Sequence, residues 1–356
     1  MSRTRRAGIS AAFGYLQFAL AFVSGIVLVP FILRSVGSEA YGLWLGFGEL
    51  LAYSAMVDLG VLNVLPWLVA ESDGRGDRER MRSLLSGGVT LGAAAALAFA
   101  LLAAALLALA PWITGVSAAQ RDTVAGPLAV VVAGMALAYP VRACYSVLIG
   151  LQDVVFAGAM SVAQVALNVA LVVGLLLGGY GLYALAAAAA VPGVFVGVVS
   201  VFRLRKTAPD LLHWRRPPLA LLRMITVQGF GSWTAALGWR MVAASNTLVV
   251  LSVAGPEAAV VFAVTAKLGE VAMQMSWQLP DAGLVGLAQL KGEERPERVR
   301  EVVVSLLRLV LLGSGAVACA VLAFNPSFVR LWVGEERFGG LALNALLAGA
   351  VLAHSL

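Results

Sequence analysis

Five polar side chains recur along one apolar stretch of the chain, and their types suit ion pairing or the binding of a charged ligand. They are Lys267, Glu270, Gln274, Gln278 and Asp281. A helix that turns about 100° per residue gathers them into a stripe about 80° wide. A charged side chain facing lipid costs about 2.5–3.5 kcal/mol at the bilayer centre, so this face is expected to line water or contact protein. The alternative is an intrahelical Lys267–Glu270 pair, with the amides joining neighbouring helices.

Arg240 lies near the middle of another apolar segment, residues 228–252. An arginine at that depth needs an anionic partner. The partner is either a carboxylate, Glu270 or Asp281, or an anionic substrate. Arginine presents planar donors that suit phosphate oxygens, whereas lysine acts as a compact point charge. Arg240 with Lys267 is therefore the leading candidate for a phosphate-binding pair.

The composition places these residues in a membrane protein. Of 356 residues, 61% are hydrophobic and 12% are charged, and the mean hydropathy is +0.91. Soluble domains have about 45–50% apolar and 25% charged residues. Apolar runs of about 20 residues, long enough to cross a bilayer as helices, recur along the chain. We expect about ten spans, over residues 12–33, 42–69, 84–110, 124–148, 154–178, 182–202, 228–252, 259–287, 302–323 and 341 to the end.

The distribution of positive charge predicts the orientation. If the segments between spans alternate sides, most Lys and Arg residues share the side of the N-terminus, and the other side holds Arg34, Arg121, Arg330 and Arg337. The positive-inside rule then predicts a multi-pass membrane protein with a cytoplasmic N-terminus. This topology explains the net charge of +6, and no nucleic-acid-binding module is visible.

The chain contains a weak internal repeat. A shift of 218 residues aligns Val36–Gly42 with Ala254–Val260, and then Gly74 with Gly292 and Arg82 with Arg300. Two like-oriented halves of this kind enclose a central cleft in parallel-repeat transporters. The predicted lobes are residues 1–218 and 219–356, and the second lobe is expected to lack helices 11 and 12.

The same shift relates the polar stripe to the second predicted span. It places Glu49 opposite Lys267 and Asn63 opposite Asp281. Glu49 and Lys267 are a predicted gating pair at equal depth, and Asn63 is predicted to face the cleft. The predicted substrate-binding set is Arg240, Lys267, Gln274, Gln278, Asp281 and Asn63. Asp58 lies on the face of this helix opposite Glu49, at a depth that suits a structural pair with Arg142.

Five short motifs resemble those of polysaccharide flippases in the multidrug/oligosaccharidyl-lipid/polysaccharide (MOP) superfamily. They are VPFILRSVGSEAYGLW from Val29, VDLG from Val57, YSVLIGLQD from Tyr145, GGYGLYALAAA from Gly178 and FVRLWVGEE from Phe328. The resemblance implies an all-α, two-lobed membrane bundle of the MOP/MATE-like type that works by alternating access. Its implied substrate is a polyprenyl-pyrophosphate-linked oligosaccharide moved to the outer leaflet, and its implied location is the bacterial inner membrane. Implied partners are this lipid-linked oligosaccharide, membrane lipids, and a polysaccharide polymerase or glycosyltransferases, with no cofactor.

Three alternatives remain open. A multidrug/toxin extrusion-type cation antiporter would share the fold, and its acidic residues typically lie in the first lobe, where Glu49 and Asp58 occur. An integral-membrane enzyme would need clustered carboxylates, metal ligands or an activated nucleophile, and the short loops show none. Cys144 and Cys319 lie in apolar runs without metal-ligand spacing. Because family members have twelve or fourteen spans, an inactive truncated flippase is the third alternative.

Overall fold

The computed structural model describes residues 3–243, 245–271, 273 and 296–354. These residues are helical throughout, apart from short turns. The chain divides into two compact units, Met1–Glu257 and Ala258–Leu356, and each is described by itself. The predicted lobe boundary between residues 218 and 219 stays a prediction.

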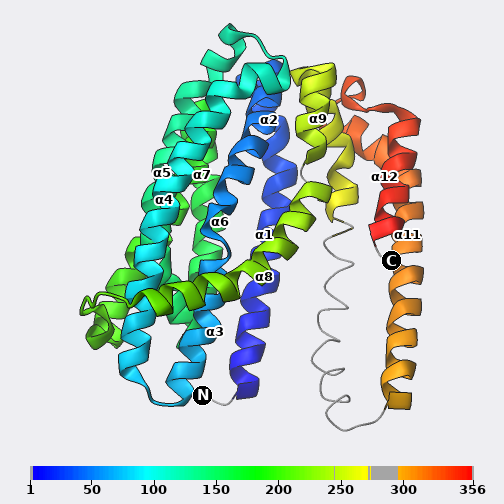
Figure 1. Ribbon diagram of the computed structural model, residues 1–356. Coiled ribbons are helices and arrows are strands. Elements are labelled where there is room, and N and C mark those ends of the chain that lie inside the picture. The colour runs from blue at the N-terminus through cyan, green and yellow to red at the C-terminus, as the bar shows by residue number, and fades with distance from the viewer. Residues whose placement is uncertain (1–2, 244, 272, 274–295, 355–356) are drawn as a thin grey trace. The chain divides into compact units, whose positions relative to one another are not determined.

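The first unit is a bundle of long helices joined by short turns (Figure 1). Helix α5 packs against α4 and α7, α1 packs against α6, and α8 crosses α3. The elements are α1 (Arg3–Val36), α2 (Ser38–Ser54), η1 (Ala55–Asp58), α3 (Val61–Gly74), α4 (Arg78–Thr114), α5 (Ala118–Gly150), α6 (Val154–Leu177), α7 (Leu182–Thr207), η2 (Pro209–Leu212), α8 (Leu219–Ala243) and α9 (Ser245–Ala254).

Small residues set the close packing of α5 against α7. A Cβ added to Gly134 would lie 2.3 Å from the Cβ of Ala190, and one added to Gly197 would lie 2.3 Å from a methyl of Val141. Membrane helices lack a hydrophobic force that drives them together in lipid, so close van der Waals contact at small residues holds them. The abundance of Ala and Gly in this chain is therefore a packing requirement.

Seven helical segments of the described residues are long and apolar enough to cross a membrane. They coincide with seven predicted spans, and large apolar side chains such as Leu97, Leu101 and Val27 point outward from them, more than 60% exposed. The predicted span 228–252 is instead divided between α8 and α9. The predicted span 259–287 lies mostly outside the described residues, and the last predicted span is the shorter helix α12.

The turn from α5 to α6 belongs to the motif YSVLIGLQD. Asp153 caps α6 by accepting a hydrogen bond from the backbone N–H of Phe156 at 3.4 Å. Its other oxygen pairs with Arg203 Nε of α7 at 2.8 Å, and the Arg203 guanidinium lies 5.7 Å from the Phe156 ring centre. One carboxylate thus fixes the start of α6 and ties it to the end of α7.

The segment between α7 and α8 is held against the start of α4. Arg82 Nε donates to the Asp210 carbonyl at 2.9 Å, and the Arg215 N–H donates to Ser86 Oγ at 3.3 Å. Arg215 also forms an ion pair with Glu79. The predicted interlobe linker therefore follows a defined path over the end of α4.

The second unit contains α11 (Pro296–Val333), η3 (Glu335–Arg337), α12 (Gly340–His354) and a helical stretch over residues 258–271. Two buried asparagines join them. Asn325 Nδ2 donates to the Thr265 carbonyl at 2.9 Å and to Asn344 Oδ1 at 2.8 Å. Asn344 Nδ2 donates to the Leu322 carbonyl at 3.4 Å, a group that Pro326, which has no N–H, leaves without its helical donor.

Candidate functional site

The second span is broken near its middle, in the motif VDLG. Helix α2 ends at Ser54, η1 makes a tighter turn, and Leu59 and Gly60 adopt left-handed φ angles of 48° and 72° before α3 begins. Glycine takes this conformation without a steric penalty. The Gly60 N–H donates to Asp58 Oδ1 at 3.2 Å, a short-range bond that favours the turn.

Two donors from other helices satisfy carbonyls at the break. Tyr139 of α5 donates its hydroxyl to the Ala55 carbonyl at 2.6 Å, and Trp233 of α8 donates Nε1–H to the Met56 carbonyl at 2.6 Å. Inside a membrane, backbone groups released by a helix break need protein or water partners. Hydrogen bonds from α5 and α8 therefore stabilise the break in the second span.

Helix α8 crosses the break at a glycine pair. A Cβ on Gly60 would lie 2.4 Å from the Gly229 carbonyl oxygen, and a Cβ on Gly229 would lie 2.4 Å from that of Leu59. Real Cβ atoms do not approach backbone this closely, so both positions require glycine for this crossing.

A cavity of about 300 Å³ lies beside the break. Its walls are formed by small or apolar residues of α2, η1 and α8, including Met56. Its polar residues are Asp58, Asn63 and Trp233. A carboxylate, an amide and an indole around one cavity can bind a polar or cationic group.

The cavity contains one predicted substrate-facing residue and one residue that was assigned a structural role. Asn63, on α3, is exposed and lines the cavity. Asp58 lines it as well, and its Oδ1 accepts the hydrogen bond from the Gly60 N–H. The Asp58–Arg142 pair stays a prediction. Sequence reasoning missed Trp233, whose role depends on a contact 177 residues away in the chain.

The remaining predicted site residues fall outside this cavity. Lys267 Nζ pairs with Glu270 Oε2 at 3.2 Å, which is the intrahelical alternative that the sequence left open. Glu49 is half-buried on α2 and belongs to the other unit, so the Glu49–Lys267 gating pair stays a prediction. Arg240 lies on α8, but its side chain is outside the described residues. The described residues also do not include Gln274, Gln278 and Asp281.

Among the residues that the structure describes, no group of three or more His, Cys, Asp or Glu side chains is placed to hold a metal ion. Cys144 is buried in α5, and Cys319 is exposed on α11, and both are free thiols.

No protein-family model matches the sequence, and no curated protein does. Solved structures do match along nearly the whole chain. An inward-facing multidrug resistance MATE family transporter of the MOP superfamily gives a TM-score of 0.71 at 16% identity, covering 99% of this chain and 80% of that one. An outward-facing one gives 0.63 at 14%, covering 98% and 80%. The MATE multidrug transporter DinF-BH, in complex with R6G, gives 0.63 at 15%, covering 100% and 83%.

At these identities the likeness shows the fold alone. The chain has the fold of the MATE transporters of the MOP superfamily, which confirms the predicted all-α membrane fold class. Together with the apolar helices, it indicates a multi-pass membrane protein.

Proposed function

We propose that the protein is an alternating-access flippase that moves a polyprenyl-pyrophosphate-linked oligosaccharide across the membrane for surface polysaccharide biosynthesis. The observation that carries this proposal is the VDLG motif, Val57 to Gly60, which forms the break in the second span of a MOP-type fold. Discontinuous helices of this kind line substrate paths in transporters, because irregular backbone is tolerated where it borders a cavity. The other four flippase-like motifs occur in the family's order along the same chain.

The substrate's chemistry sets two demands on such a flippase. The pyrophosphate and sugars need a polar, hydrated path, while the polyprenyl tail stays in lipid. Lys267 and Arg240 are the proposed cations for the pyrophosphate. The Lys267 ammonium already has Glu270 as a partner, so the pyrophosphate would compete with that carboxylate.

A second candidate function is the export of organic cations. The cavity beside the break combines the Asp58 carboxylate with the Trp233 ring, and a carboxylate beside an aromatic face suits a bulky organic cation. The structural neighbours include multidrug transporters, one of them in complex with R6G.

The decisive experiment reconstitutes the purified full chain in liposomes and measures transport of two substrates. One is a fluorescent lipid-linked oligosaccharide with a pyrophosphate, and the other is a fluorescent organic cation. Oligosaccharide flipping above that of protein-free liposomes supports the flippase. Transport of the cation alone rejects it in favour of the second candidate.

Substitutions then test the proposed pyrophosphate contacts. Arg240→Ala should reduce flipping, while Arg223→Ala, an exposed arginine on the same helix, should leave it unchanged. Glu270→Gln should raise the apparent affinity for the substrate, because it removes the carboxylate that holds Lys267. Unchanged flipping by Arg240→Ala removes that residue from the proposed site.

A further inference from the structure

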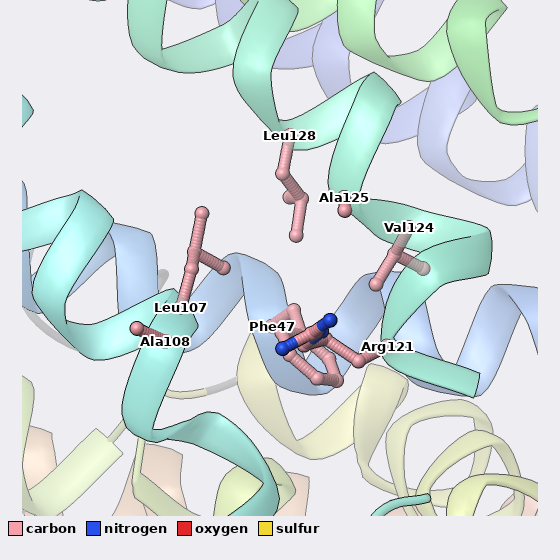
Figure 2. Close-up of a pocket in the computed structure, with 7 residues that line it drawn as sticks. All are labelled: Phe47, Leu107, Ala108, Arg121, Val124, Ala125 and Leu128. Carbon is pink, nitrogen blue, oxygen red and sulfur yellow. The ribbon is translucent and has the colours of Figure 1, made fainter. Parts of the chain in front are cut away.

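A second cavity lies between α2, α4 and α5, close to the turn that joins α4 to α5 (Figure 2). Its volume is about 200 Å³. Phe47, Val124 and Leu128 form an apolar floor, and all three side chains are fully buried, so they lie beneath the open surface of the cavity. Ala108 and Ala125 are exposed at its edge, where their short side chains leave the space open. Such a cavity accepts an apolar chain from the surface of the bundle.

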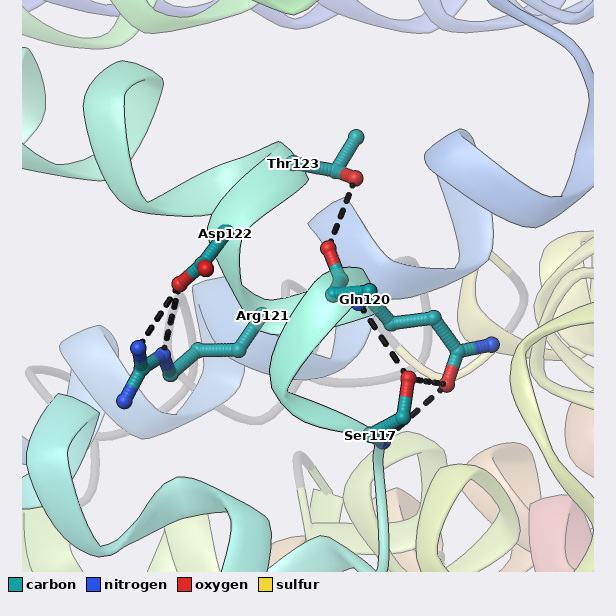
Figure 3. A network of polar contacts seen from close by, with 6 residues as sticks. Ser117, Gln120, Arg121, Asp122 and Thr123 are labelled. Carbon is teal, nitrogen blue, oxygen red and sulfur yellow. Dashed lines mark hydrogen bonds and ion pairs between the residues drawn. The ribbon is translucent and has the colours of Figure 1, made fainter.

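Arg121 is the charged member of the lining. Its Nε and Nη2 donate to Oδ1 of the adjacent Asp122, at 3.1 and 2.7 Å (Figure 3). The Asp122 side chain is 64% exposed, whereas that of Arg121 is 36% exposed. The guanidinium therefore sits at the cavity while its carboxylate partner faces outward. Within the described part of the chain, Nη1 makes no hydrogen bond, so it can donate to a ligand.

The first turn of α5 holds Arg121 in place. Ser117 and Gln120 form a capping box, with Ser117 Oγ accepting from the Gln120 N–H and the Gln120 side chain accepting from the Ser117 N–H (Figure 3). Gln120 Nε2 also donates to Glu39 Oε1 of α2 at 2.7 Å. The capping box and the Gln120–Glu39 hydrogen bond fix the start of α5 against α2, and these two helices form opposite walls of the cavity.

The depth of these residues suits one kind of ligand. Helices α4 and α5 both belong to candidate membrane spans, and Arg121 lies in the first turns of α5, beside the connection between them. Leu128 lies seven residues further along, about 10 Å deeper at 1.5 Å per residue. A positive group at headgroup level above an apolar floor at acyl-chain level matches an amphiphile with an anionic head.

We propose that this cavity binds one anionic phospholipid, with its phosphate at Arg121 and the upper part of an acyl chain against Leu107, Ala108 and Ala125. A soluble phosphate would gain nothing from the apolar floor. A zwitterionic lipid would bring its own cation beside the guanidinium. Asp122 competes with the phosphate for Arg121, so removal of that carboxylate strengthens binding.

The test measures lipid retention by the purified full chain in mild detergent, using native mass spectrometry. The added ligands are phosphatidylglycerol, phosphatidylcholine with the same acyl chains, and glycerol 3-phosphate. The wild type should retain one phosphatidylglycerol in preference to the other two. Arg121→Gln should weaken that binding roughly tenfold, as expected for loss of a charge-assisted hydrogen bond, and Asp122→Asn should strengthen it.

Two further variants separate the cavity from general surface charge. Arg75→Gln removes an exposed arginine that likewise has a carboxylate partner, Glu71 at 2.6 Å, and should leave retention unchanged. Ala125→Leu narrows the cavity without changing charge and should reduce retention. Equal retention by Arg121→Gln and Arg75→Gln overturns the proposal, as does unchanged retention by Ala125→Leu. Binding of glycerol 3-phosphate as tight as that of the lipid assigns Arg121 to a soluble phosphate and also overturns it.

Discussion

Gly229 is the position at which α8 crosses the break in the second span, and alanine there should weaken the first unit. The added Cβ would lie 2.4, 3.0 and 3.1 Å from backbone atoms of Leu59, Gly60 and Val61, none of which can rotate away as a side chain would. Overpacking of this kind costs about 1–3 kcal/mol. Alanine also stabilises a helix by about 1 kcal/mol relative to glycine, which partly offsets the loss in the free energy of unfolding.

Gly231, two residues further along α8, supplies the matched control. A Cβ there meets nothing within 4 Å, so Gly231→Ala receives the helix-propensity gain without the contact. The difference in unfolding free energy between Gly229→Ala and Gly231→Ala therefore isolates the crossing, and should be about 1–3 kcal/mol. Unfolding by SDS in mixed micelles, followed by circular dichroism, measures both. Equal stability of the two variants would refute the close crossing of α8 and the break.

Three other substitutions test separate contacts. Trp233→Phe keeps the ring but removes the Nε1–H donor to the η1 carbonyl, and should cost about 1–2 kcal/mol in the same SDS unfolding measurement. Asn344→Leu removes the acceptor of Asn325 and a donor to two carbonyls of α11, and should cost about 1–3 kcal/mol by that method. If Glu49 and Lys267 attract across the cleft, Glu49→Lys and Lys267→Glu should each reduce oligosaccharide flipping, and the double variant should restore it. Equal loss in all three variants would argue against the pair.

Much of the helical organisation was predictable because bilayer crossing depends on local composition. Runs of about 20 apolar residues identified seven segments that the structure forms as helical spans, six of them continuous helices and one broken at residues 55–60. The division of residues 228–252 between α8 and α9 was not predicted. Hydropathy does not distinguish one continuous helix from two adjacent ones, since both are apolar.

The break in the second span shows where sequence reasoning reaches its limit. Asp58 and Gly60 carry a local turn signal, because the aspartate can bond the glycine N–H. The sequence gives no sign of the distant donors, Tyr139 and Trp233, that satisfy the released carbonyls. The local half of this feature was therefore open to prediction, while the half that depends on tertiary contacts was not.

Among the charged residues, too, local contacts were predictable from the sequence and tertiary contacts were not. The Lys267–Glu270 contact is three residues apart on one helix, so its existence followed from periodicity as one of two alternatives. Arg121 was predicted only as one of a few positive charges on the side opposite the N-terminus. Its place at an apolar cavity depends on Phe47 and Leu107, which come from two other helices.

The Trp233–Met56 hydrogen bond offers a way to locate the boundary between the two lobes of the proposed flippase. Tyr139 and Trp233 each donate to one carbonyl of η1, both at 2.6 Å, so the two bonds are nearly matched. If the lobes divide between residues 218 and 219, as the repeat predicts, the Trp233 bond joins the two lobes while the Tyr139 bond stays within the first. Rocking of the lobes would then break the Trp233 bond in each cycle. The two variants Trp233→Phe and Tyr139→Phe test this boundary. Trp233→Phe should change the flipping rate more than Tyr139→Phe does, at similar cost in the free energy of unfolding. Equal flipping rates in the two variants would mean that α8 moves with the first lobe, which would place the boundary after this helix.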